Sequence, residues 1–360
     1  MPNTVVIAPD SFKGSLSARL VADAIAEGWA SVRPDDELVL MPQADGGEGT
    51  LDAVEAAVPG ARRRSAGLVT GPDGRPVPGE WLELPDGTAV TELAQSSGLP
   101  LMASPAPLTA TTRGLGEVIR AALDAGARSV VIGLGGSAST DGGAGALSAL
   151  GLLLLDEQGE PVPDGGAGLL EVLRIDRDEL VAPPAGGVVL LTDVTAPLLG
   201  PSGAAAVFGP QKGASPEQVA ELDRALGHFS RFLGGDPLAP GSGAAGGAGY
   251  GFAAAWKARI EPGADYLMTL SGLPSAIGEA DLVLTGEGRF DDQSLGGKLV
   301  GQLIGLAGAE RVGVIAGQVT ASGGVWSASL TELAGSAEAS LADTAAWLRE
   351  AGRRAAEELG

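Results

Sequence analysis

Short apolar runs rich in β-branched residues alternate along the chain with stretches in which apolar residues recur every three or four positions. The runs predict buried strands, and the longer spacing predicts helices with one apolar face. After the first run, Leu16, Leu20 and Ile25 share a helical face that Ser15 is placed to cap, and a short helix is expected from about Leu51. The predicted strands are residues 5–8, 38–41, 129–133, 188–192, 282–285 and 312–316.

This alternation predicts an α/β fold with a doubly wound parallel sheet and helices on both faces. Glycine-rich or acidic loops follow several strands, which is the side where such sheets bind ligands. The pattern is interrupted near residues 60–80, where Arg62-Arg63-Arg64 is interpreted as a solvated edge, and again near residues 263–275. Because single cores rarely exceed ~250–300 residues, 360 residues predict two domains.

Charge and composition exclude several classes of function. The chain has 23 basic and 45 acidic residues, a net charge of −22, which argues against binding to nucleic acid or to an anionic membrane. There is no cysteine and one histidine, His228, so thiol chemistry and zinc–cysteine sites are excluded. His228 lies in an amphipathic helical stretch and is interpreted as structural. The first residues predict a strand rather than a signal peptide, and no apolar run is long enough for a membrane span, so a cytoplasmic protein is expected.

One glycine motif supports an alternative function. Residues 133–138, Gly-Leu-Gly-Gly-Ser-Ala, match the dinucleotide fingerprint, and Asp156 ends the next predicted strand at a suitable distance for a ribose hydroxyl. A nicotinamide-dependent oxidoreductase is therefore the rival hypothesis. Against it, Gly142 and Gly143 fall where the first helical turns should be, at a cost of about 1 kcal/mol each.

Lysines and carboxylates favour phosphoryl transfer instead. Only four lysines occur against nineteen arginines, and three of them, Lys13, Lys212 and Lys298, adjoin a glycine. Lysine is a compact charge suited to phosphate or carboxylate, and acids hold Mg²⁺ or orient a hydroxyl. The acids expected at strand ends are Asp10, Asp45, Glu48, Asp193, Glu287 and Asp291.

Six motifs follow one another along the chain. They are Ala-Pro-Asp-Ser-Phe-Lys-Gly-Ser at 8–15, Asp-Gly-Gly-Glu-Gly-Thr at 45–50, Gly-Gly-Ser-Ala at 135–138, Asp-Gly-Gly at 141–143, Val-Phe-Gly-Pro-Gln-Lys-Gly-Ala at 207–214, and Thr-Gly-Glu-Gly-Arg at 285–289 followed by Asp291. In this order they resemble the motifs of the bacterial type I glycerate kinases. The resemblance runs from about residue 4 to about residue 350. It departs from the family pattern at Thr140, where an asparagine is expected, and at Ala196, which replaces the asparagine of an Asn-Pro pair.

The resemblance implies an ATP- and Mg²⁺-dependent kinase that phosphorylates D-glycerate, with 2-phosphoglycerate as the product associated with the family. It also implies a discontinuous Rossmann-like domain of residues 1–65 and 270–360, an inserted α/β domain of residues 66–269, and an active site in the cleft between them. A non-catalytic protein that binds a nucleotide or sugar acid is a further alternative. The sequence leaves open which hydroxyl reacts, which carboxylate is the base, and whether the chain forms a homo-oligomer.

Roles for individual residues combine the resemblance with the loop chemistry. Asp193 is expected to orient or deprotonate the hydroxyl, with Asp291 as the next candidate, and Lys13 to bind an anion near a helix N-terminus. Asp45 and Glu48 are candidate ligands for Mg²⁺. The substrate-binding set is Asp10, Ser11, Lys13, Asp45 and Gly46, and the cofactor-binding set, expected to cradle the phosphates of ATP, is Gly133, Gly135, Gly136, Ser137 and Lys212.

Overall fold

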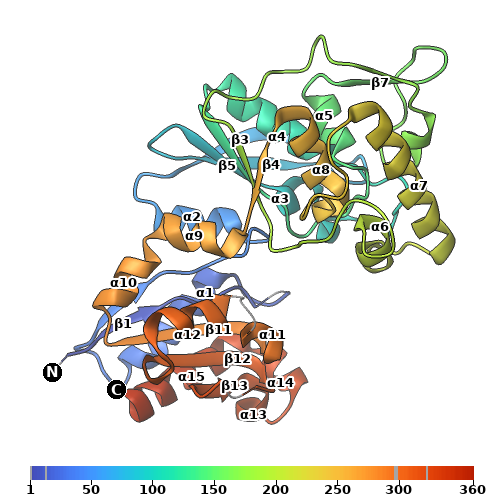
Figure 1. Ribbon diagram of the computed structural model, residues 1–360. Coiled ribbons are helices and arrows are strands. Elements are labelled where there is room, and N and C mark those ends of the chain that lie inside the picture. Colours follow the sequence, from blue (N-terminus) through green and yellow to red (C-terminus); the bar gives the residue numbers. More distant parts are fainter. Residues whose placement is uncertain (1, 13, 296–298, 322) are drawn as a thin grey trace. The chain divides into compact units, whose positions relative to one another are not determined.

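The computed structural model describes residues 2–12, 14–295, 299–321 and 323–360 (Figure 1). It divides into two compact units. Unit 1 comprises Met1–Asp45, Asp52–Pro59 and Ala264–Gly360, and unit 2 comprises Gly46–Leu51 and Gly60–Gly263. That the chain folds as two domains with boundaries at 65/66 and 269/270 stays a prediction.

Unit 1 is built on a five-stranded sheet in the order β13-β12-β11-β1-β2, and every pairing is parallel. Two helices, α2 (Thr50–Ala57) and α9 (Gly263–Ser271), each contain a boundary between the units. The strands are β1 (Thr4–Ile7), β2 (Glu37–Leu40), β11 (Leu282–Phe290), β12 (Val312–Val319) and β13 (Trp326–Ser329). The helices within unit 1 are α1 (Ala18–Ala30), α10 (Leu273–Glu279), α11 (Asp292–Leu295), α12 (Leu299–Ala307), α13 (Leu330–Ala334), α14 (Ala337–Ala342), α15 (Thr344–Leu359) and the 3₁₀ turn η4 (Ala309–Arg311).

Both faces of this sheet are covered, because successive side chains of a strand point to opposite faces. Val5 and Ile7 pack with residues of α1 and α15, whereas Val6 packs with residues of α10 and α12. The predicted parallel sheet with helices on both faces is therefore confirmed. Helices α1 and α15 approach closely where Gly28 lies: a Cβ there would stand 2.0 Å from the carbonyl oxygen of Arg349.

The start of α1 differs from the prediction. The helix begins at Ala18, and the Oγ of Ser17 caps it by accepting from the N–H of Leu20 at 3.4 Å. Ser15, the predicted cap, instead has its Oγ 2.6 Å from the Oγ1 of Thr344. The prediction of Ser15 as the cap was wrong because both serines precede the same apolar face, and sequence spacing did not separate them.

Unit 2 is built on a six-stranded sheet in the order β10-β9-β6-β5-β4-β3. The four strands from β10 to β5 are parallel, and β4 and β3 are antiparallel. The strands are β3 (Arg62–Thr70), β4 (Pro76–Glu83), β5 (Thr88–Glu92), β6 (Ser129–Gly133), β9 (Val188–Leu191) and β10 (Arg259–Glu261), with a separate pair β7 (Leu153–Leu155) and β8 (Arg174–Asp176). The helices are α3 (Leu93–Ser97), α4 (Arg113–Asp124), α5 (Ala144–Ala149), α6 (Ala204–Phe208), α7 (Pro216–Leu233), α8 (Ala244–Trp256) and the 3₁₀ turns η1 (Leu99–Leu101), η2 (Ala167–Glu171) and η3 (Pro210–Lys212).

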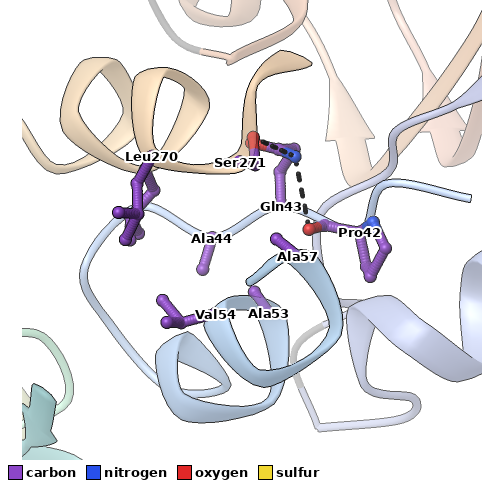
Figure 2. A pocket seen from close by; sticks show the side chains of 9 residues that line it. Pro42, Gln43, Ala44, Ala53, Val54, Ala57, Leu270 and Ser271 are labelled. Carbon is purple, nitrogen blue, oxygen red and sulfur yellow. Dashed lines mark hydrogen bonds between the residues drawn. The ribbon is translucent and has the colours of Figure 1, made fainter. Parts of the chain in front are cut away.

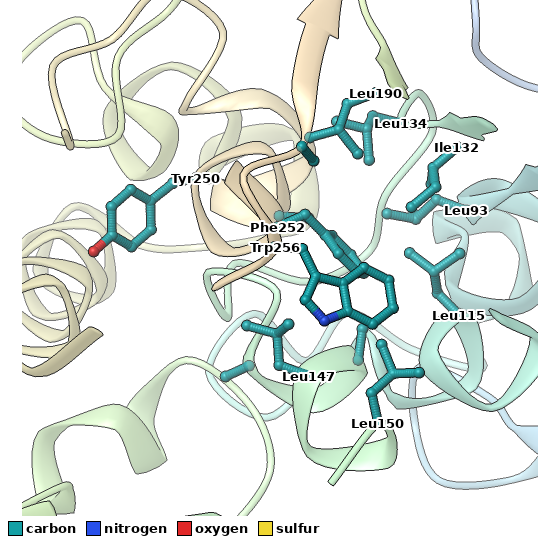
Figure 3. Packing of buried hydrophobic residues seen from close by; sticks show 14 of the residues in the cluster. Leu93, Leu115, Ile132, Leu134, Leu147, Leu150, Leu190, Tyr250, Phe252 and Trp256 are labelled. Carbon is teal, nitrogen blue, oxygen red and sulfur yellow. The ribbon is translucent and has the colours of Figure 1, made fainter. Parts of the chain in front are cut away.

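The core of unit 2 is a single apolar cluster. Side chains of β6 and β9, including Ile132 and Leu190, pack with Leu115 of α4 and with the rings of Phe252 and Trp256 on α8 (Figure 3). The two rings have centroids 5.6 Å apart in a tilted arrangement. This cluster fixes the parallel strands, and therefore the loops that follow them.

The interruption predicted near residues 60–80 is an antiparallel hairpin at the edge of the sheet. Its arginines lie on the edge strand β3, where Arg63 pairs with Glu80 at 3.1 Å and Arg62 with Glu83 at 3.3 Å. Charged side chains on an edge strand oppose pairing with another chain. The interpretation of the three arginines as a solvated edge therefore agrees with their position.

Candidate functional site

Four parallel strands of unit 2 end at one edge of the sheet and carry polar loops there. Strand β5 ends at Glu92, β6 at Gly133, β9 at Leu191 and β10 at Glu261. The glycine-rich loop of residues 134–140 follows β6, and Asp193 follows β9. This is the edge at which open α/β sheets bind ligands.

The segment Gly46–Leu51 packs on the same edge. The N–H of Gly135 donates to the carbonyl oxygen of Gly46 at 3.0 Å. A Cβ on Gly135 would stand 2.4 Å from the Cα of Gly47, and a Cβ on Gly133 would stand 2.7 Å from the oxygen of Gly46. Gly46, Gly133 and Gly135 are therefore brought together, and chain packing requires glycine both at the last residue of β6, Gly133, and at Gly135 in the loop after it. Gly136 is exposed, so its backbone is open to a ligand.

Lys212 and Ser137 also lie together. Lys212 is 3 % exposed, and its Nζ donates to the Oγ of Ser137 at 2.8 Å and to the carbonyl oxygen of Ser139. Burial lowers the pKa of Lys212 to about 7, although the negative charge of Asp141 opposes the shift. An ammonium group has three donors, so two bonds leave one for a ligand. The donor set fits a phosphate in charge and chemistry.

Asp141 is fully buried and was not predicted as a site residue. Its carboxylate accepts from the N–H of Thr112 at 2.9 Å, the Oγ1 of Thr112 at 2.8 Å, and the N–H groups of Gly143 and Gly145 at 3.2 Å each. Burial raises the pKa of Asp141, against the effect of these bonds. The Asp-Gly-Gly motif therefore fixes the loop after β6 and the start of α5, with a negative charge near Lys212.

Glu92 is a second buried acid that the sequence analysis did not identify. It is 7 % exposed, and its two carboxylate oxygens accept from the N–H groups of Gly49 and Leu51 at 3.1 Å each. The sequence signal that could have identified it is the short stretch with β-branched residues at 88–91, which is typical of a strand and places Glu92 at the strand end.

Asp193 and Glu48 are exposed acids of unit 2. The Oδ1 of Asp193 accepts from the N–H of Gly263, the first residue of α9, at 2.8 Å. Asp193 thus caps a helix N-terminus. Glu48 lies between Gly47 and Gly49, on the segment that Glu92 contacts.

The remaining predicted acids lie at the carboxyl edge of the unit 1 sheet. Asp10 follows β1, Asp45 lies in the loop between β2 and α2, and Asp291 follows β11. Glu287, also predicted at a strand end, lies within β11 instead, because this strand continues to Phe290. The N–H of Ser11 donates to the Oδ1 of Asp10 at 2.6 Å, and Asp291 lies 3.4 Å from the Nε of Arg289. Lys13, predicted to bind an anion, and Lys298 lie outside the described residues.

A small cavity in unit 1 adjoins the loop that carries Asp45. Its volume is about 10 Å³, room for a single water molecule, and it is lined mainly by apolar side chains such as Val54 and Leu270 (Figure 2). Gln43 closes it by donating from Nε2 to the carbonyl oxygen of Met41 at 2.8 Å and to the Oγ of Ser271 at 3.4 Å. This cavity is too small for a substrate.

No group of three or more carboxylates or histidines that could hold a metal ion occurs among the described residues. Asp45 belongs to unit 1 and Glu48 to unit 2. Within the same described residues, no helix is both long and apolar enough to cross a membrane.

The rival dinucleotide hypothesis is wrong. It required Asp156 to end the next strand of the sheet, but β7 pairs antiparallel with β8 in a separate two-stranded sheet. The Oδ1 of Asp156 accepts from the N–H groups of Gln158 and Glu160 at 2.9 Å each, so this carboxylate stabilises a turn.

Parallel sheets with glycine-rich and acidic loops at their carboxyl edges place the chain among the α/β proteins that bind small ligands there. A model of the Glycerate kinase family matches residues 5–360, and the chain belongs to that family. The predicted class of enzyme, a kinase, is thereby confirmed.

Individual relatives agree. The chain is 44 % identical over 304 residues to the glycerate 2-kinase of Escherichia coli K12, covering 82 % of this chain and 79 % of that one. It is 44 % identical over 303 residues to the glycerate kinase of Bacillus subtilis 168, covering 82 % and 79 %. A crystal structure from Salmonella typhimurium LT2, assigned as glycerate kinase 2, matches with a TM-score of 0.82 and 39 % identity over 100 % of this chain and 98 % of that one.

Proposed function

We propose that the enzyme transfers the γ-phosphate of ATP to a hydroxyl of D-glycerate, with 2-phosphoglycerate as product and Mg²⁺ as cofactor. The observation that carries the proposal is the family match along residues 5–360 together with relatives named glycerate kinase or glycerate 2-kinase. Within the family, the order of its motifs favours the bacterial type I group.

The phosphates of ATP are proposed to lie at the loop after β6. The exposed Gly136 offers its backbone there, and Gly135 shapes the loop by allowing the close approach of Gly47. The buried Lys212, held by Ser137, offers a positive charge when it is protonated. A buried cation interacts strongly with an anion, because little water is present to screen the two charges. Gly133 serves this loop by allowing the close approach of Gly46.

The substrate and metal are proposed to contact the acidic loops. Asp193 would accept the proton of the attacking hydroxyl, with Asp291 as the alternative base. Asp45 and Glu48 supply the carboxylate oxygens that Mg²⁺ prefers, and bound Mg²⁺ would neutralise developing charge on the phosphates. The remaining proposed substrate contacts are Asp10, Ser11, Lys13 and Gly46.

The proposed reaction is an in-line displacement. A bond forms between the glycerate oxygen and the γ-phosphorus as the bond from that phosphorus to the β,γ-bridging oxygen breaks, and ADP leaves with the electron pair. The hydroxyl proton passes to the Oδ of Asp193. As a proton acceptor, Asp193 should contribute a factor of roughly 10²–10⁴ to the rate.

The test is ADP formation by purified enzyme with ATP, Mg²⁺ and D-glycerate, with each component omitted in turn and L-glycerate as the stereochemical control. Phosphorus NMR identifies the product, because the phosphorus of 2-phosphoglycerate couples to one methine proton and that of 3-phosphoglycerate to two methylene protons. The absence of glycerate-dependent ADP formation from about pH 6 to about pH 9, with an active family member run in parallel, would refute the proposal.

A further inference from the structure

Glu92 is a buried carboxylate whose partners lie far away in sequence. Its Oε1 accepts from the N–H of Gly49, and its Oε2 accepts from the N–H of Leu51, at 3.1 Å each. Burying a carboxylate is costly unless hydrogen bonds satisfy it. Each carboxylate oxygen of Glu92 therefore accepts a hydrogen bond from the segment Gly46–Leu51.

The two donors belong to the start of α2. Backbone N–H groups at a helix start lack intrahelical partners, and a negative charge there is favourable. A short side chain next to the helix could serve this purpose at lower cost. Here the acid is Glu92, which is buried at the end of β5. The same contact therefore also fixes the start of α2 relative to the edge of the sheet.

The segment is held at a second point. The carbonyl oxygen of Gly46 accepts from the N–H of Gly135, in the loop after β6, at 3.0 Å. Within the segment, the hydroxyl of Thr50 donates to the carbonyl oxygen of Gly47 at 2.7 Å. Glu48 lies between these points and is exposed. The two attachments therefore bracket the one acidic side chain of the segment.

We propose that Glu92 is a positioning residue for the reaction: it fixes Gly46–Leu51 so that Gly46 is presented to the substrate in one geometry. This inference rests on the proposed function. Glu92 is not proposed to contact the substrate or ATP. It acts through the two backbone N–H groups from which it accepts hydrogen bonds.

The matched control is Glu117 of α4, in the same unit. Its carboxylate accepts from the N–H of Thr70 at 2.6 Å and from the Oγ1 of Thr70 at 2.8 Å, so it also holds a distant strand end with two bonds. None of the proposed site residues lies on β3. E117Q therefore removes a comparable charge-assisted contact without touching the segment.

E92Q keeps the size of the side chain but turns one acceptor into a donor that faces an N–H. We expect the KM for glycerate to rise at least about fivefold while the KM for ATP changes less than about twofold, and E117Q to alter neither. E92D keeps the charge and should recover part of the loss. It also provides the test if E92Q does not fold.

Hydrogen exchange gives a readout independent of turnover. In E92Q the amides of residues 46–51 should exchange at least about tenfold faster than in the wild type, while E117Q leaves them unchanged. Unchanged exchange, or unchanged kinetics in folded E92Q, would overturn the proposal. A wild-type enzyme inactive on glycerate would refute the proposed function instead, and the exchange experiment would still decide whether Glu92 holds the segment.

Discussion

Replacing the buried Lys212 with methionine should remove a pH-dependent contribution to the free energy of unfolding. Lys212 is 3 % exposed, and burial lowers its pKa to about 7 in the folded chain. In the unfolded chain a lysine titrates near ~10.4. Between these two pKa values the unfolded state holds more protons than the folded state, so the stability of the wild type rises with pH across this window.

The magnitude follows from the size of the window. Each pH unit over which the two states differ by one proton is worth about 1.4 kcal/mol. Between about pH 6, where Lys212 is charged in both states, and about pH 9, where only the unfolded state is charged, the gain is about 3 kcal/mol. Lys212→Met carries no proton in either state, so its unfolding free energy lacks this contribution.

The assay is urea denaturation of the two proteins at intervals from about pH 6 to about pH 9. The quantity of interest is the difference in unfolding free energy between wild type and Lys212→Met, which should grow by about 3 kcal/mol in favour of the wild type. Lys257→Met, which removes an exposed lysine, is the control and should follow the wild-type curve. A difference that stays constant across this range would refute the argument that burial depresses this pKa.

Three further predictions concern turnover. Asp193→Asn should lower kcat at least ~10²-fold. The thermal midpoint should change little, because the amide oxygen can still accept from the N–H of Gly263. A preserved kcat would mean that Asp193 is only a helix cap. His228→Ala should keep turnover within about threefold, since the Nε2 of His228 contacts the carbonyl oxygen of Val172 at 2.7 Å, and a collapse of rate in folded protein would contradict its structural role. Lys13→Ala should lower kcat/KM by roughly 10- to 150-fold, and Lys13→Arg should recover less than half of that free energy; full activity in both variants would remove Lys13 from the site.

The sequence was sufficient to predict the parallel strands β1, β2, β6, β9, β11 and β12 because each contains a run of apolar residues, whereas β5, β10 and β13 were not predicted. Val5, Val6 and Ile7 form an unbroken apolar run, as a strand covered on both faces requires. The edge that carries the acids followed from the same pattern, since parallel strands end on one side of a sheet. Asp10 and Asp193 were therefore predicted at strand ends, each without reference to the other.

The antiparallel strands β3 and β4 were not predicted, for a physical reason. An edge hairpin has one face exposed, and its sequence is interrupted by glycine, proline and charge, which are also the signals of a linker. Pairs such as Arg63 with Glu80 stabilise it across the strands. Such pairing joins residues of two strands and leaves no periodic signal in either one.

The buried acids show the limit of sequence reasoning most clearly. Glu92 and Asp141 are ordinary acids in the sequence, and each acquires its role only when backbone N–H groups from another part of the chain reach it. The same holds for Gly135. Its sequence context is typical of a phosphate-binding loop, but the atom that leaves no room for a side chain there is the Cα of Gly47. A glycine beside a ligand and a glycine beside a distant backbone have the same local signal, because both need the space of a missing Cβ. What distinguishes them is the partner, and the partner is a property of the folded chain.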